Sequence, residues 1–141
     1  MTGTSSDEFR SMVLDYMDKG FLDNIIDMFK HDETLFPMLV DMVKDERLRV
    51  RLGATALVEE FVHVNPALLA PLVPGLAALL KDGNPTVRGD SANLLGIIGH
   101  PDALRSLKEA EDDENREVRE IVREAIADIS SAQAASQSRG G

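Results

Sequence analysis

The amino-acid sequence predicts an all-α fold, a right-handed α-solenoid of about four stacked helical hairpins. Three observations predict it. Short amphipathic segments are separated by glycine, proline, asparagine and aspartate, which favours helices joined by tight turns. No segment alternates apolar and polar residues in the way that a half-buried strand does. A self-similar pattern recurs at spacings of 37 and 31 residues, as stacked repeats require.

Eight helices are expected along the chain, each bounded by residues that favour a helix end. Pro37 falls near the first turn of the third helix, where its missing N–H is tolerated. Pro66 begins the fifth helix, which is expected to bend near Pro71 or Pro74, and Gly99 ends the sixth. The expected ranges are 7–18, 21–30, 33–44, 48–64, 66–81, 86–98, 102–111 and 117–130.

These helices group into hairpins, each made of a helix, a tight turn and a second helix. One hairpin cannot bury its apolar stripe alone, whereas stacked hairpins form a continuous core. The predicted organisation is a flexible N-terminus at 1–6, a solenoid over 7–130 and a disordered tail at 131–141, which contains few bulky apolar residues. Within the solenoid we expect an atypical first hairpin at 7–31 and repeats at 33–64, 66–99 and 101–130.

The internal repeat has a defined residue pattern. Three times an aspartate is followed, after four residues, by Val-Arg: Asp45 with Val50-Arg51, Asp82 with Val87-Arg88, and Asp113 with Val118-Arg119. Apolar or small residues then stand four, seven, eight and eleven places beyond the valine, on one stripe of a helix. They are Ala54, Leu57, Val58 and Phe61; Ser91, Leu94, Leu95 and Ile98; Val122, Ala125, Ile126 and Ile129.

This pattern resembles that of the HEAT-repeat family. In that family Val-Arg is followed by small and apolar residues and then by Leu-Gly-x-Ile-Gly, and the stretch from Val87-Arg88 to Ile98-Gly99 is similar to this motif. The resemblance covers residues 33–130 and is strongest to the short bacterial and archaeal HEAT-like type, which includes bilin lyase subunits. Residues 7–31 lack the signature, as a terminal repeat often does.

The resemblance implies a structural role for the repeated charges. In the family the aspartate and arginine form a ladder of ion pairs between stacked repeats. A guanidinium binds a turn carboxylate and loop carbonyls at once, which agrees with that role. The alternative is a row of arginines that binds a ligand. The residues concerned are Asp45, Arg51, Asp82, Arg88, Asp113 and Arg119.

The resemblance also implies where a partner binds, because the second helix of each repeat lines the concave face of HEAT-like stacks. Positions opposite the core stripe of those helices mix small residues, which would open a groove, with polar residues, which would orient a partner. We expect a protein partner there, with a second copy of the chain as the alternative. The candidates are Thr55, Ala56, Glu59, His63, Gly89, Ala92, Asn93, Gly96, Arg123 and Glu124.

Composition narrows the classes of partner. The net charge of −10 disfavours phosphate backbones and anionic membrane surfaces, so neither nucleic acid nor a membrane is expected as a partner. No apolar run approaches the ~18 residues that a membrane span needs, and no signal peptide is evident, so a cytoplasmic location is expected. The absence of cysteine excludes disulfides and thiolate chemistry.

Two clusters have alternative interpretations. Glu59, His63 and His100 have the chemistry of metal ligands, but no second carboxylate repeats the arrangement, which favours solvated histidines at helix ends. Five methionines and five of the six aromatic residues fall between residues 9 and 42, where they either fill an irregular core or form an adaptable binding patch. The methionines are Met12, Met17, Met28, Met38 and Met42.

No catalytic constellation, cofactor site or metal site is recognisable in the sequence. The expected function is therefore a non-catalytic protein–protein interaction scaffold or adaptor that binds its partner on the concave face. Two alternatives come from the family resemblance alone: an accessory subunit of a bilin-lyase-like enzyme, and a metal-dependent HEAT-like enzyme.

Overall fold

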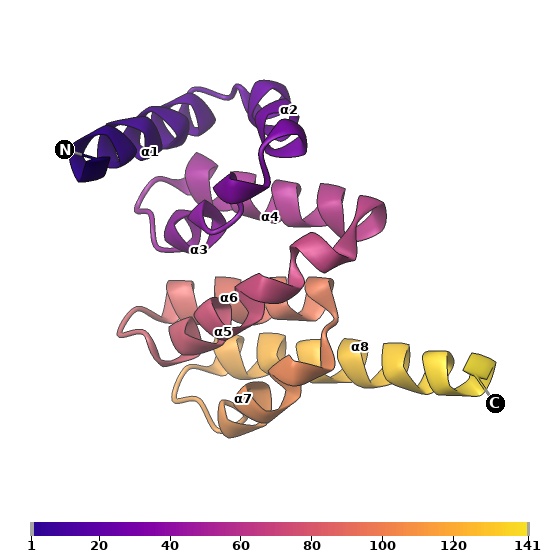
Figure 1. Ribbon diagram of the computed structural model, residues 1–141. Helices are drawn as coiled ribbons and strands as arrows, with labels where there is room; N and C mark the ends of the chain where they lie inside the picture. The colour runs from indigo at the N-terminus through magenta and orange to yellow at the C-terminus, as the bar shows by residue number, and fades with distance from the viewer. Residues whose placement is uncertain (1, 141) are drawn as a thin grey trace. The chain divides into compact units, whose positions relative to one another are not determined.

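The computed structural model describes the backbone of residues 2–140 and the side chains of residues 7–136. Across that backbone the regular structure is α-helix and 3₁₀-helix with no strand, which confirms the all-α class. None of the described helices combines the length and the apolar character needed to cross a membrane. The chain divides into two compact units, Met1–Leu57 and Val58–Gly141, and the boundary falls inside helix α4 (Leu48–Val64) (Figure 1).

Unit 1 contains two helical hairpins. Helices α1 (Thr2–Asp18) and α2 (Leu22–His31) form the first, while η1 (Glu33–Leu35), α3 (Met38–Val43) and the start of α4 form the second. Gly20 makes the turn between α1 and α2 at φ +92°, a left-handed conformation that glycine adopts without a side-chain clash. Its N–H donates to the carbonyl of Met17 at 3.1 Å, which satisfies one carbonyl at the end of α1.

The core of unit 1 draws apolar side chains from each of its helices. Phe29 of α2 meets Phe36 edge to face, with ring centroids 5.2 Å apart. Helix α1 packs closely on α4 because residue 53 is glycine: a Cβ there would overlap the side chain of Met17. The buried apolar residues of this unit include Val13, Met17, Ile25, Phe29, Leu35, Phe36, Leu39, Met42, Val43, Val50, Ala54 and Leu57.

Two predicted helices are interrupted, and proline explains both breaks. The predicted helix 33–44 is divided at Pro37 into η1 and α3. The predicted helix 66–81 becomes η2 (Pro66–Leu68), η3 (Ala70–Leu72), α5 (Val73–Ala78) and η4 (Leu79–Lys81). Pro71 has no N–H and its ring would clash with the carbonyl four residues earlier, so a continuous α-helix does not form here. Pro74 lies in the first turn of α5, where proline is tolerated.

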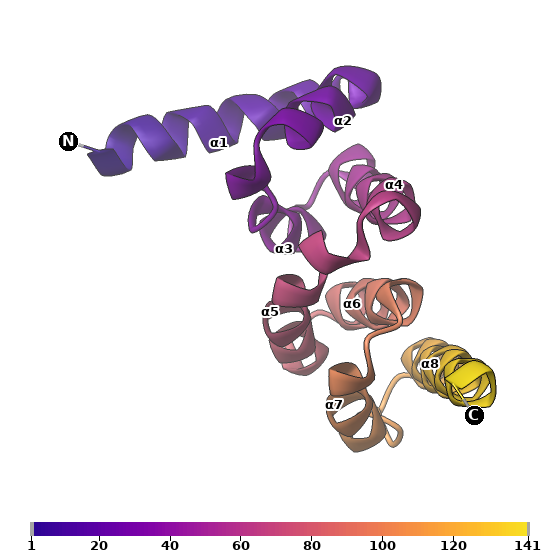
Figure 2. The same ribbon diagram turned by 45° about the vertical axis from the view of Figure 1, so that its right-hand side comes forward.

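Unit 2 also contains two stacked hairpins. After α5 come α6 (Pro85–Ile98), η5 (Pro101–Ala103), α7 (Leu104–Glu109) and α8 (Arg116–Gly140). Helix α6 begins where the Asn84 side chain accepts from the Thr86 N–H at 2.9 Å, and it ends at Gly99 with φ +74°. Figure 2 shows α5 and α7 on one side of this unit and α6 and α8 on the other.

The core stripe that the repeat predicts is confirmed. Of its twelve positions ten are buried, and the other two, Ile98 and Ile126, are half-buried. Because the same offsets from Val50, Val87 and Val118 are covered in all three repeats, the repeat in the sequence is a repeat in the packing.

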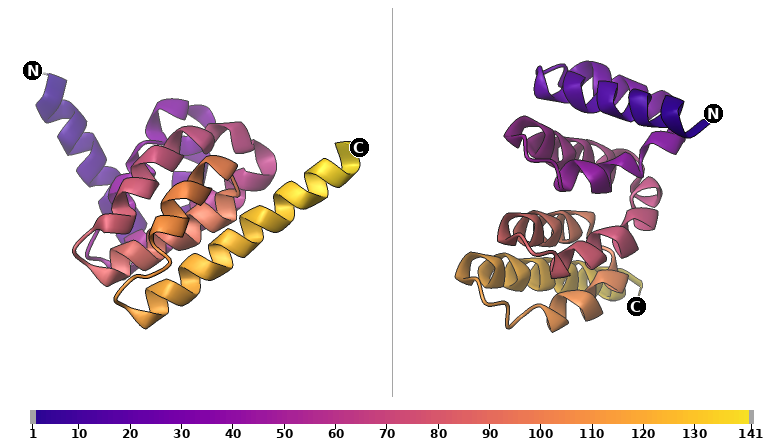
Figure 3. Two further views of the ribbon diagram at one scale, coloured as in Figure 1. Left: turned by 90° about the horizontal axis from the view of Figure 1, so that it is seen from below. Right: turned by 90° about the vertical axis from the view of Figure 1, so that its left-hand side faces the viewer.

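Both ends of the described chain are helical where the sequence analysis predicted flexibility. Helix α1 begins at Thr2 rather than at residue 7, and α8 continues to Gly140, past the other helices of unit 2 (Figure 3). Ala132, Ala134 and Ala135 have the highest intrinsic helix propensity, and they extend a helix that is already nucleated. The structure thus has a helix over 131–140 where the sequence predicts a disordered tail. Residues 1 and 141 lie outside the described backbone.

Candidate functional site

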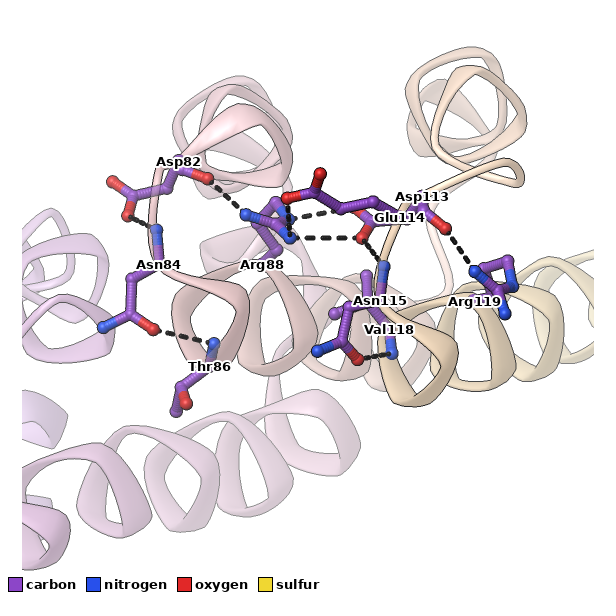
Figure 4. Close-up of polar contacts among 9 residues, drawn as sticks. All are labelled: Asp82, Asn84, Thr86, Arg88, Asp113, Glu114, Asn115, Val118 and Arg119. Atoms are coloured by element: carbon purple, nitrogen blue, oxygen red, sulfur yellow. Dashed lines mark hydrogen bonds and ion pairs between the residues drawn. The ribbon is translucent and has the colours of Figure 1, made fainter.

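A buried arginine–carboxylate pair joins the two repeats of unit 2 (Figure 4). The side chains of Arg88 and Asp113 are 8% and 9% exposed. The Arg88 Nε donates to Oδ2 of Asp113 at 2.9 Å and its Nη2 donates to Oδ1 at 3.2 Å, which is a bidentate pair. Its Nη1 also donates to the carbonyl of Asp82 at 2.9 Å. One side chain on α6 thus holds the turn before α6 and the turn before α8.

The environment of Asp113 stabilises its ionised form. Burial by itself raises the pKa of this carboxyl, but the hydrogen bond from Arg88 and the backbone N–H of Asn115, at 2.9 Å, more than offset the burial. The net effect is a pKa below the usual value of an aspartate. The pair is therefore charged at neutral pH.

The fixed spacing of aspartate and arginine has one local cause in all three repeats. Arg119 Nη1 donates to the Asp113 carbonyl at 2.7 Å, in the same way that Arg88 donates to the Asp82 carbonyl. Arg51 Nη1 donates to the carbonyls of Asp45 and Glu46 at 3.0 and 2.8 Å. In each repeat the arginine binds the backbone of the aspartate six residues earlier, which secures the turn between the two helices of the hairpin.

An ion pair between stacked repeats, as the family resemblance implies, is present in unit 2. In unit 2 the carboxylate that pairs with Arg88 belongs to Asp113 of the following repeat, not to Asp82 of its own. The Asp82 carboxylate instead accepts the backbone N–H of Asn84 at 2.9 Å (Figure 4). Aspartate in these turns orders the backbone two residues ahead, which is the usual role of an Asx turn.

Unit 1 has a connection between its hairpins that the sequence analysis missed. Arg47 Nε donates to the Asp45 carboxylate at 3.0 Å and its Nη1 donates to Asp15 of α1 at 2.7 Å. These contacts raise the pKa of Arg47 and lower that of Asp45. The sequence does contain a signal for this connection. Two residues after the aspartate, the other repeats have Asn84 and Asn115, whereas this repeat has Arg47.

Three small residues of the predicted concave row, all on α6, are covered wholly or in part. Gly89 and Ala92 are buried, and Gly96 is half-buried. A Cβ on Gly89 would stand 3.3 Å from Ile121 Cδ1, and one on Gly96 would stand 3.0 Å from Cα and Cβ of Ala125. Gly89 and Gly96 let α6 and α8 approach closely, so these two glycines serve the packing between the helices.

The other seven candidates remain at least partly accessible. Thr55 and Ala56 are half-buried, while Glu59, His63, Asn93, Arg123 and Glu124 are exposed. A small groove of about 180 Å³ lies between the starts of α6 and α8, and most of its residues were not among the candidates. The repeat contains a signal for this groove, since its polar residues stand one or three places before the valine or three places after it. The lining is Pro85, Thr86, Gly89, Asp90, Asn115, Glu117, Val118 and Ile121.

The two histidines considered as metal ligands have separate surroundings. His63 is exposed near the end of α4. His100 caps η5: its Nδ1 accepts the N–H of Asp102 at 3.1 Å, and the Asp102 carboxylate lies 3.7 Å away. Among the described residues, no group of three or more histidine, aspartate or glutamate side chains is placed to hold a metal ion.

A groove of about 400 Å³ lies within unit 1, where the turn between α1 and α2 faces α4. We call it the unit 1 groove. Most of its surface is apolar, and Leu52, on its wall, is 58% exposed. Arg49 adds a positive charge and donates to the Asp18 carbonyl at 3.4 Å. The lining residues are Met17, Gly20, Leu22, Arg49, Leu52, Gly53 and Ala56.

The methionine-rich segment between residues 9 and 42 is divided between core and surface. Met17, Met38 and Met42 are buried, Met28 is half-buried and Met12 is 39% exposed. Aromatic residues of the first hairpin are also accessible: Phe9, Tyr16 and Phe21 are 38%, 39% and 48% exposed. Tyr16 and Phe21 meet edge to face, with centroids 5.7 Å apart. Core filling thus accounts for most of the methionines but not for the aromatic residues of α1.

A second, larger cleft lies within unit 2, between α5 and α7. Its volume is about 590 Å³. We call it the outer cleft, because it lies on the α5 and α7 side of this unit. Its lining residues are Pro74, Ala77, Ala78, Leu80, Lys81, Ser106, Glu109, Ala110, Asp112 and Asp113.

Comparison with known proteins agrees with this architecture. A family model described as HEAT repeats matches residues 67–127. This part of unit 2 contains α5, α6, α7 and α8 as far as Ala127. No curated protein matches the chain, so the similarity to bilin lyase subunits is not confirmed. The matched segment contains two of the three Asp and Val-Arg patterns and the arginine–carboxylate pair between them. Residues 67–127 of unit 2 therefore match the HEAT-repeat family.

Proposed function

We propose that this chain is a non-catalytic protein-interaction module that holds a partner through the unit 1 groove. The observation that carries this proposal is the exposure of large apolar side chains around a formed apolar groove. Leu52 on the groove wall and Leu48 on the same helix are 58% and 59% exposed, and Phe21 beside the α1–α2 turn is 48% exposed. Exposed apolar groups gathered around a cavity are typical of sites where proteins bind one another.

Burial of these side chains supplies the energy of binding. Each Å² of apolar surface removed from water is worth about 25 cal/mol, so covering one leucine and one phenylalanine contributes several kcal/mol before the costs of association. The groove walls are ordered by packing, since Met17 is 2% exposed and rests on Gly53. A preformed wall loses little conformational freedom when a partner binds.

The proposed site contains one residue of the predicted concave row, on α4, and none of its residues on α6. Ala56 of α4 was a candidate from the sequence, and it lines the unit 1 groove. Gly89 and Gly96 of α6 pack against α8 and Ala92 is buried, so these three residues are not part of the proposed site. The expected partner presents an apolar anchor residue for the pocket beside Leu52, with a polar or acidic neighbour facing Arg49.

A matched pair of substitutions on α4 tests this function. Leu52 and Val64 are both exposed apolar residues of the same helix, at 58% and 65%, but only Leu52 lines the groove. We expect Leu52→Glu to abolish capture of the partners that the wild-type chain retains from native extract, because a carboxylate in an apolar pocket is costly to desolvate. Val64→Glu introduces the same charge outside the groove and is expected to retain them.

Two further measurements make the test decisive. Both variants are first shown to melt like the wild type, so that lost binding does not reflect lost folding. A photo-crosslinking residue is then placed at position 52 or 64 in the full chain, and partners are expected to crosslink from position 52. Equal capture by Leu52→Glu and by Val64→Glu, or crosslinking from position 64 alone, would contradict the proposal.

A further inference from the structure

We infer that the outer cleft of unit 2 is a second binding site, which takes a cationic amphipathic peptide segment of a partner protein. This inference goes beyond the proposed function and does not depend on it, because it concerns different residues in a different unit. It rests on how the cleft forms, on the chemistry of its two walls and on their charges.

The cleft follows from unequal packing of the two hairpins. Helices α6 and α8 meet at close range, since a Cβ on Gly96 would stand 3.0 Å from Ala125. On the other side of the unit, α5 contacts η5 ahead of α7, and beyond that contact a space of about 590 Å³ opens between α5 and α7. The cleft therefore exists because small residues bring one pair of helices together while the other pair is held apart.

One wall of the cleft is apolar and is formed by α5 and η4. Ala77 is half-buried and Ala78 is exposed, and neither has the bulk to close the space. Pro74 and Leu80 complete this wall with further hydrocarbon surface. Such a wall favours aliphatic side chains, or the methylene groups of lysine and arginine.

The facing wall is acidic and is formed by the end of α7 and the turn that follows. Glu109 and Asp112 line the cleft and are exposed, and they belong to a segment in which residues 111–114 are all acidic. Arg88 pairs with Asp113 and lies 3.7 Å from Glu114, so it compensates part of this charge from behind. Among the described residues that line the cleft, Lys81 carries the one positive charge, which leaves an excess of carboxylates.

The two walls together define the occupant. A neutral apolar segment would leave Glu109 and Asp112 facing a hydrophobic surface, and a purely charged segment would gain nothing from Ala77 and Ala78. A segment with aliphatic residues on one side and lysine or arginine on the other satisfies both walls. The net charge of −10 on the chain adds a long-range attraction for such a segment and raises its rate of encounter.

Three labelled peptides of equal length provide the probe. The first alternates leucine and arginine, the second replaces each arginine with glutamate, and the third replaces each leucine with serine. Their binding to the full chain is measured by fluorescence anisotropy, and the site is mapped from shifts of backbone amide resonances. We expect saturable binding of the leucine–arginine peptide alone, weakened by salt, with the largest shifts at Ala77, Ala78 and Ser106.

Matched variants test whether peptide binding requires the carboxylates of the outer cleft and its open space. Glu109→Gln with Asp112→Asn removes one glutamate and one aspartate carboxylate from the cleft. Glu124→Gln with Asp128→Asn removes one carboxylate of each type from the exposed face of α8. The cleft variant is expected to bind the peptide about ten-fold more weakly and the α8 variant much as the wild type does. Ala78→Trp fills the cleft and is expected to block binding, while Ala127→Trp on exposed α8 is not.

The following results of the peptide and variant measurements would contradict the proposed site in the outer cleft. Equal binding of the serine–arginine peptide would mean that the apolar wall is not used and that a simple polycation suffices. Equal binding of the leucine–glutamate peptide, equal loss in the two charge-matched variants, or shifts centred in unit 1 would each place the interaction elsewhere. An absence of saturable binding would show that the outer cleft does not take this class of ligand.

Discussion

At the scale of single residues, Arg88 has the most demanding environment in unit 2. Its guanidinium is nearly buried, and it reaches a carboxylate of the next repeat and a carbonyl of its own turn at 2.9 Å each. A buried charge is costly unless it is paired and hydrogen-bonded, and here Asp113 and the Asp82 carbonyl provide both. The geometry favours a structural role for this arginine, because its donors face the protein's own turns rather than solvent.

Asp113→Asn tests the contribution of the pair and its dependence on pH. At neutral pH the variant is expected to lose about 2–3 kcal/mol of unfolding free energy, because Arg88 stays buried without its counter-charge. The pKa of Asp113 is lowered in the folded protein, so its stabilising effect is complete above the unfolded value of about 3.9 and disappears as the pH falls through the folded value. The difference between wild type and variant in urea unfolding should therefore shrink below about pH 4.

Asp128→Asn is the control, since it removes the same charge from an exposed position on α8. It is expected to change the unfolding free energy by less than about 0.5 kcal/mol at neutral pH. A difference between wild type and Asp113→Asn that stays constant down to pH 3 would contradict the linkage between the ionised carboxylate and stability.

At the scale of the element, α6 shows why one helix of a stack has several distinct faces. Its valine-based stripe is buried in the core, Gly89 and Gly96 face α8, and Asn93 is exposed. The equivalents of Gly89 and Ala92 on α8 are the charged, exposed residues Glu120 and Arg123. Small residues therefore occur where a following helix packs within this unit, and charged ones occur where the face meets water.

Gly96→Leu tests the close approach of α6 and α8. A leucine at this position would overlap Ala125, whose Cα stands 3.0 Å from the place of the first side-chain carbon. We expect a loss of about 1–3 kcal/mol in unfolding free energy from overpacking, measured by thermal or urea denaturation. Gly83→Leu is the matched control, because nothing lies within 4 Å of a Cβ there and its φ is not positive. Similar losses in both variants would mean that glycine is not required for the packing.

At the scale of the whole molecule, the chain combines apolar exposure in unit 1 with acidic surface in unit 2. Phe9, Tyr16 and Phe21 are exposed in the first unit, whereas residues 111–114 of the second are all acidic. Two surfaces of different chemistry favour partners of different chemistry, one with an apolar anchor and one with positive charge.

Removal of residues 131–141 tests how much the end of α8 contributes to the molecule. Residues 131–136 are exposed apart from half-buried Gln133, so they bury little apolar surface. We expect the truncated chain to keep its melting temperature within about 2 °C and to lose part of its far-ultraviolet helical signal. A large fall in melting temperature would show that this segment packs on the body of the protein, and an unchanged helical signal would show that it is not helical.

The helical class, the hairpin repeat and the core stripe can be predicted from the sequence alone, because they follow from local periodicity. Offsets of four, seven, eight and eleven residues describe one helix face wherever the helix lies, and those positions are buried. The turns were equally local: arginine reaches the carbonyl of the aspartate six residues earlier in each repeat. The HEAT resemblance rested on the same spacing, which the family match over 67–127 supports.

Which other helix faces are covered depends on how the helices pack against one another. Within the sequence of α6 alone, Gly89 and Gly96 have the pattern of groove residues, and their role in packing follows only from the position of α8 against them. The partner of Arg88 is Asp113, 25 residues away, and neither that pairing nor the contact of Arg47 with Asp15 follows from local spacing. The two large cavities arise in the same way, because a cavity depends on the distance between helices, which packing sets and periodicity does not.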